Sequence, residues 1–98
     1  MENDKMILVE MICSSYNVEA DFIDTLIDCG LIEVVTVEQH QFIDKNRVND
    51  LERMIRLHYD LDINMEGIET ITHLLQRMQM LQDEMLVLKN RLRFYEND

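Results

Sequence analysis

The chain opens with two short segments whose apolar positions predict a pair of helices. Residues 6–15 are mostly apolar and predict a short, largely buried helix, and residues 16–18 predict a turn. Residues 19–29 predict a second helix, which we expect Gly30 to end because glycine readily takes the left-handed conformation that closes a helix. Two short helices joined by a tight turn form a helix-turn-helix arrangement.

The second predicted helix has one apolar face and one acidic face. The apolar face carries Phe22, Ile23, Leu26 and Ile27. The opposite face follows the i, i+3, i+4, i+7 spacing of a helix and carries Asp21, Asp24, Thr25 and Asp28. Two interpretations stay open for the acidic face. It is either a solvated surface that keeps the protein in solution, or a surface that binds a basic partner.

Beyond Gly30 the pattern changes from helical to extended. Residues 31–37 are apolar and β-branched, residues 41–43 form a second such run, and residues 37–40 supply a turn without an Asn-Gly pair. This pattern predicts a small β-hairpin, or wing. Asp44 is a predicted cap for a third helix over residues 45–59. The apolar stripe of that helix contains Val48, Leu51, Ile55 and either Leu57 or His58.

A heptad repeat runs through the last third of the chain. After a link over residues 60–63, Asn64 is a predicted cap for one helix from Met65 to about Tyr95, with Glu66 in its first turn. The a positions are Ile71, Met78, Met85 and Leu92, and the d positions are Leu74, Leu81, Leu88 and Tyr95. All eight are apolar, which predicts a coiled coil and a homodimer formed through this seam.

Further apolar residues of the same helix lie outside the seam and indicate a second contact: Met80, Leu86, Val87 and Phe94. The alternative to dimerisation is a helix that folds back on its own domain. The seam leaves the relative orientation of two helices open. We predict a helix-turn-helix domain over residues 1–63 and a dimerisation helix over residues 64–98.

Charge is distributed unevenly along the chain. The formal net charge is −11, and residues 1–44 contain ten acidic residues and a single base, Lys5. Such a surface repels phosphate groups, so we expect no direct binding of nucleic acid or of a membrane surface, and we expect a basic partner. A small basic patch formed by Lys45, Arg47, Arg53 and Arg56 is expected to pair with Asp50, Glu52 and Asp60.

No motif in the sequence brings catalytic or metal-binding groups together. The histidines fall on separate predicted elements, and the cysteines form no Cys-x-x-Cys pair: His40, His58, His73, Cys13 and Cys29. We interpret both cysteines as core residues on the apolar sides of their helices. There is no glycine-rich phosphate loop. We therefore expect no enzyme activity, no metal and no cofactor.

Other features favour a cytoplasmic protein. Two cysteines without a recognisable leader are typical of reduced thiols. Residues 1–5 lack the positive charge of a secretory signal, and no stretch approaches the roughly 20 apolar residues needed to cross a bilayer.

The order of the predicted elements resembles that of MerR-type regulators: a helix-turn-helix, a wing, further helices and a long terminal coil. Residues 56–68 resemble the junction through which that family enters its dimerisation helix. From about Met6 to Tyr95 the chain resembles one branch, the CbpM-like chaperone modulators. The segments that carry this resemblance are residues 18–22, 30–33, 53–61, 67–68 and 88–92. The implied fold is a mainly α winged helix-turn-helix with a small β-hairpin and a long C-terminal coiled-coil helix.

The resemblance implies a function through protein binding. CbpM-like proteins bind the J-domain of a DnaJ/CbpA-type co-chaperone and restrain both its stimulation of a DnaK-type chaperone and its DNA binding. The alternative is a MerR-type DNA-binding transcription regulator, whose second helix would use basic and amide side chains on DNA. Here that helix has no Arg or Lys and carries Glu19, Asp21, Asp24 and Asp28. A third hypothesis is a scaffold domain that only dimerises.

Overall fold

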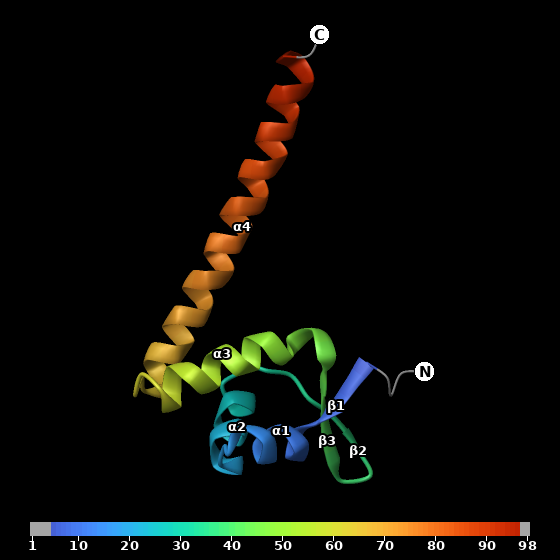
Figure 1. Ribbon diagram of the computed structural model, residues 1–98, viewed down its shortest axis with the longest axis vertical. Coiled ribbons are helices and arrows are strands. Elements are labelled where there is room, and N and C mark those ends of the chain that lie inside the picture. The colour runs from blue at the N-terminus through green and yellow to red at the C-terminus, as the bar shows by residue number, and fades with distance from the viewer. Residues whose placement is uncertain (1–4, 97–98) are drawn as a thin grey trace. The chain divides into compact units, whose positions relative to one another are not determined.

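The computed structural model describes residues 5–96, and its contacts divide the chain into two compact units (Figure 1). The first unit ends at Asn64 and the second begins at Met65. The predicted division into a domain over residues 1–63 and a dimerisation helix over residues 64–98, which together form one structural unit, stays a prediction. Residues 1–4, which entered the expectation that the chain has no secretory signal, lie outside the described residues.

The first unit contains the predicted helix-turn-helix. Helix α1 spans Val9–Tyr16 and helix α2 spans Ala20–Asp28. Asn17 follows α1 with φ 57°, and the Val18 N–H donates to the Cys13 carbonyl oxygen at 2.9 Å. Gly30 follows α2 with φ 76°, as predicted. Both helices thus end at a left-handed residue, and the chain turns sharply after each of them.

Residues 6–8 form a strand, so the prediction of a helix over residues 6–15 is wrong at its start. Strand β1 (Met6–Leu8) pairs antiparallel with β3 (His40–Asp44), and β3 pairs antiparallel with β2 (Val35–Val37). The sheet order is β1-β3-β2 (Figure 1). Residues 6–8 are extended because they pair with β3, which is distant in the chain. A local sequence pattern cannot predict such a pairing.

The hairpin is confirmed but is shorter than predicted. Residues 31–34 lie outside the strands, and buried Ile32 anchors them. Glu38 and Gln39 form the turn between β2 and β3 with φ 51° and 71°. A two-residue hairpin turn of type I′ needs positive φ at both positions, and here two residues without the freedom of glycine supply it.

Asp44 caps the third helical segment as predicted, but α3 itself begins three residues later than predicted. The Asp44 side chain accepts a hydrogen bond from the Asn46 N–H at 2.9 Å and caps the 3₁₀ turn η2 (Lys45–Arg47), which leads into α3 (Val48–Tyr59). The buried stripe of α3 consists of Leu51, Met54 and Ile55. Met54 is a member of this stripe that was not predicted.

Side chains from α1, α2, β3 and α3 form the core of the first unit. Its most deeply buried side chains are Ile23 and Leu26 from α2, Ile43 from β3 and Leu51 from α3. The predicted apolar face of α2 is confirmed, because Phe22, Ile23 and Leu26 are buried.

The second unit is the helix α4 (Met65–Glu96), which has 32 residues and is about 48 Å long at a rise of about 1.5 Å per residue. Ile68 and Thr72 are buried, whereas every residue from Gln76 to Glu96 is exposed. Capping of α4 by Asn64 stays a prediction. Across residues 5–96, no helix combines the length and the apolar character that a membrane crossing requires.

Candidate partner-binding surface

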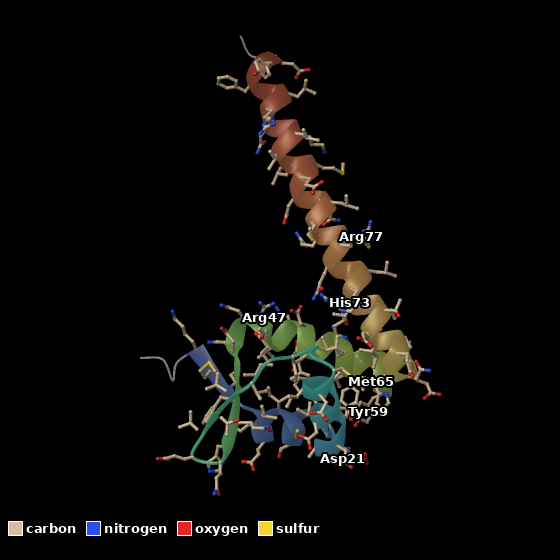
Figure 2. The ribbon with its side chains drawn as sticks, turned by 180° about the vertical axis from the view of Figure 1, so that it is seen from behind. Asp21, Arg47, Tyr59, Met65, His73 and Arg77 are labelled. Atoms are coloured by element: carbon tan, nitrogen blue, oxygen red, sulfur yellow. The ribbon has the colours of Figure 1, made fainter. Side chains whose placement is uncertain are left out.

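The four residues predicted on the polar side of α2 all lie on its exposed face. Asp21, Asp24, Thr25 and Asp28 are exposed, and Figure 2 labels Asp21 on this helix. The Thr25 hydroxyl donates to the Asp21 carbonyl oxygen at 2.9 Å, so its side chain lies against its own helix. We call these four residues the acidic face. Their role in binding a partner stays a prediction.

An aromatic cluster holds α2 against α3. The Phe22 ring stacks on His58 with centroids 4.6 Å apart and an interplanar angle of 15°. Tyr59, labelled in Figure 2, packs edge-on against both rings. Its hydroxyl accepts a hydrogen bond from the Glu19 N–H at 3.2 Å, at the start of α2. The acidic face therefore lies on a helix that is fixed on its opposite side.

His58 belongs to this cluster and not to a metal site. Its Nδ1 lies 3.1 Å from the Ile63 carbonyl oxygen, just beyond α3. No three His, Cys, Asp or Glu side chains within residues 5–96 lie close enough together to hold a metal ion. The sequence predicts either Leu57 or His58 in the apolar stripe of this helix, and both side chains are half-buried. The stacking of His58 on Phe22 has no local signal, because Phe22 lies on another helix.

Two of the four residues of the basic patch pair with one acidic residue of α3. Arg47 and Arg53 both approach Asp50, with N–O distances of 3.8 Å and 3.6 Å. The predicted pairing with Asp50 is confirmed for these two arginines. Glu52 instead accepts a hydrogen bond from the Tyr16 hydroxyl and links α3 to α1.

A cleft runs beside the acidic face, between α1, α2 and the β2–β3 hairpin. We call it the α1–α2 cleft. Its volume is about 660 Å³, enough for more than one side chain of a partner. The helices contribute Val9, Glu10, Cys13, Ser14, Ala20 and Ile23. The hairpin contributes Thr36, Gln39, His40 and Gln41. No sequence motif identified this cleft, because its lining comes from four separate segments.

The two cysteines have different environments. Cys13 is half-buried in the α1–α2 cleft, and burial raises the pKa of its thiol, with smaller contributions from the carboxylates of Asp24 and Glu10. Cys29 follows α2 and is exposed. The interpretation of Cys29 as a core residue is therefore wrong. It lies one position beyond the last helical residue, where the apolar face of α2 no longer has a neighbour to cover it.

The heptad side chains of α4 are exposed over most of its length. Ile71 is half-buried. The exposed fractions of the seven others range from 52% for Met78 to 72% for Tyr95. One copy of the chain thus leaves the seam uncovered. The dimer itself stays a prediction.

Comparison with known proteins agrees with this architecture. Residues 7–90 match a family described as "MerR HTH family regulatory protein". A "Chaperone modulatory protein CbpM" from Pseudomonas entomophila (strain L48) is 32% identical over 83 residues, which cover 83% of this chain and 81% of the relative. A protein of the same name from Pseudomonas putida (strain W619) is 30% identical over the same lengths. The chain belongs to the CbpM branch of the MerR helix-turn-helix family.

Membership of the CbpM branch confirms the predicted fold class, a mainly α winged helix-turn-helix with a long C-terminal helix. The names of these relatives describe regulatory or modulatory proteins and not enzymes. They support a chaperone-modulating role. No solved structure matches the chain significantly.

Proposed function

We propose that this protein is a chaperone modulator that binds the J-domain of a DnaJ/CbpA-type co-chaperone and inhibits its stimulation of a DnaK-type chaperone. The observation that carries the proposal is the acidic face of α2. A helix-turn-helix regulator that reads DNA uses this second helix for base and phosphate contacts, whereas here it carries three exposed aspartates and no base.

Electrostatics favours a basic protein partner. A J-domain presents a basic helix with which it docks on its chaperone. The acidic face can occupy that helix and thereby compete with the chaperone. Opposite charges around such an interface accelerate association and select the partner. The CbpM relatives, named as chaperone modulatory proteins, support the same role.

A direct role in DNA binding has little physical support. Residues 1–44 contain one base against ten acidic residues. Arg47 and Arg53 share the Asp50 carboxylate and are partly neutralised by it. We therefore expect the protein to pass through a heparin column at moderate salt. Retention there, together with a shift of duplex DNA in a gel, would favour the transcription regulator.

We also propose that the protein acts as a cytoplasmic homodimer through α4. The supporting observation is the row of exposed apolar side chains at heptad spacing from Leu74 to Leu92. A second copy would cover this row by the knobs-into-holes packing of a coiled coil. Each copy would then present its own acidic face.

The test of the proposed function is binding of the purified J-domain, measured by calorimetry at low and moderate salt. We expect the unaltered chain to bind and to reduce co-chaperone-stimulated ATP hydrolysis. The triple variant Asp21→Lys, Asp24→Lys, Asp28→Lys should lose at least about tenfold in affinity, because three attractions become repulsions.

A matched control separates the acidic face from net charge. The variant Glu66→Lys, Asp83→Lys, Glu96→Lys changes three exposed acidic residues on α4 by the same total charge. It should bind within about threefold of the unaltered chain. Equal affinities for both triple variants would refute the acidic face as the binding surface. Absence of J-domain binding by the unaltered chain would refute the proposed function.

A further inference from the structure

The α1–α2 cleft lies next to the acidic face and has a different chemical character. We infer that this cleft receives an apolar side chain from the basic helix of the J-domain and so supplies the apolar anchor of that interface. The inference rests on the proposed function and deepens it, since it assigns to the partner segment an aliphatic or aromatic residue flanked by lysine or arginine.

The floor of the cleft fits an apolar side chain, whereas its hairpin side is polar. Val9 and Ile23 are 5% and 1% exposed, so they form a floor that is already part of the core. Half-buried Cys13 adds a weakly polar surface beside them. Exposed Ser14 and Ala20 stand at the edge and are small, which leaves the space above the floor open.

The charges at the cleft determine which residues of the partner can flank that apolar side chain. Glu10 lines the cleft, and its carboxylate acts on the Cys13 thiol together with that of Asp24. Carboxylates from both α1 and α2 therefore contribute negative charge near Cys13. The hairpin contributes one titratable group, His40, whose Nδ1 lies 3.8 Å from a Glu10 oxygen. A basic segment is attracted to this rim, whereas an acidic one is repelled.

An apolar anchor in the cleft supplies binding energy that the charged residues of the acidic face do not. Charged pairs at the rim of an interface contribute mainly to association rate and specificity. Most binding energy comes from a few side chains that fill desolvated pockets near the centre of an interface. Asp24 belongs to the acidic face and also acts on Cys13 inside the cleft. One helix can therefore contact both surfaces at once.

The first test fills the cleft with a large side chain. Ser14 lines the cleft, whereas its neighbour Ser15 does not, and both are exposed residues of α1. We expect Ser14→Phe to weaken binding of the purified J-domain at least about tenfold, and Ser15→Phe to change it less than about twofold. Thermal unfolding of both variants checks that each one folds.

The second test uses Cys13 as a probe and leaves the cleft unfilled. In a Cys29→Ser variant, Cys13 is the remaining thiol, and its alkylation by N-ethylmaleimide can be followed by mass spectrometry. We expect saturating J-domain to slow this alkylation at least about fivefold. In a Cys13→Ser variant, exposed Cys29 should be alkylated at the same rate with and without the J-domain.

The outcomes distinguish the two proposals. If the unaltered chain binds the J-domain but Ser14→Phe binds as Ser15→Phe does, the cleft is not the anchor, while the proposed function stands. An unprotected Cys13 in the complex leads to the same conclusion. If the unaltered chain does not bind the J-domain, the proposed function and the anchor are both refuted.

Discussion

Large apolar side chains form a buried core in the first unit, whereas most of those in the helix α4 are exposed. In the first unit, side chains such as Ile23, Leu26, Ile43 and Leu51 are almost completely buried by neighbours from other elements. In α4, Leu74 and the apolar side chains from Met78 to Tyr95 are more than half exposed. A contiguous exposed apolar surface of this kind marks an interaction site in a soluble protein.

Similar apolar residues therefore have different surroundings in the two regions. Those of the first unit stabilise its fold and hold the acidic face in position. Ile68 near the start of α4 is buried as well, whereas the apolar side chains from Met78 onward gain no stability from burial in the single chain and would gain it from the second copy that we propose. Substitutions in the two regions should therefore differ in whether their effects depend on protein concentration.

The largest expected effect is on dimerisation. The double variant Leu81→Glu, Leu88→Glu introduces carboxylates at two d positions of the proposed seam. We expect it to weaken the dimer by about 4 kcal/mol, roughly a thousandfold in dissociation constant, because unpaired charges would be buried between helices. Sedimentation equilibrium measures the change.

The control for this variant adds the same charge on the opposite side of the helix. Gln76→Glu, Asn90→Glu places two carboxylates at exposed heptad positions outside the seam. It should dimerise as the unaltered chain does. Equal dimerisation of the two double variants would contradict the seam and remove the contrast between the units.

The next largest effect is on the stability of the first unit. Leu26 is 0% exposed, so Leu26→Ala should lower the free energy of unfolding by about 2–5 kcal/mol at any protein concentration. Leu88→Ala removes the same atoms from a side chain that is 61% exposed. At concentrations where the protein is a monomer, its effect should stay below about 0.5 kcal/mol. Chemical denaturation at several protein concentrations measures the free energy of unfolding of both variants.

The smallest effect concerns the backbone at the ends of the two short helices. Gly30 has φ 76° and nothing within 4 Å of the position of an added Cβ, so Gly30→Ala adds strain without a clash. We expect it to lower the free energy of unfolding by about 1–2 kcal/mol. Asn17 has φ 57°. We expect Asn17→Gly to change the free energy of unfolding by less than about 0.5 kcal/mol. A loss of the same size in both variants would contradict this explanation of the turns.

Local signals in the sequence account for much of the fold. The turn at Gly30, the cap at Asp44 and the single helix of α4 each depend on residues close together in the chain, and each was predicted. Strand β1 was mistaken for helix because Met6, Ile7 and Leu8 form an apolar run that suits either structure, and β3 decides between them. Cys29 is exposed because no neighbouring element within residues 5–96 covers it. Helical spacing alone cannot predict whether such a neighbour is present.

Only part of the candidate site could be predicted from the sequence. The acidic face could be identified because all four of its residues follow the spacing of one helix. The α1–α2 cleft could not, because helices and a hairpin meet there only after folding. The cluster of Phe22, His58 and Tyr59 likewise joins two helices that are separate in the chain.

The pairing of β1 with β3 has a consequence for synthesis of the protein. Met6 is synthesised well before its partner Asp44, which follows only after the intervening segment has been made. At roughly 5–20 residues per second, β1 waits about 2–8 s for a strand to pair with. The hairpin of β2 and β3 can close as soon as it emerges, since its strands are adjacent. Both pairings need β3, but the one with β1 closes a much longer stretch of chain, so we expect it to form after the hairpin.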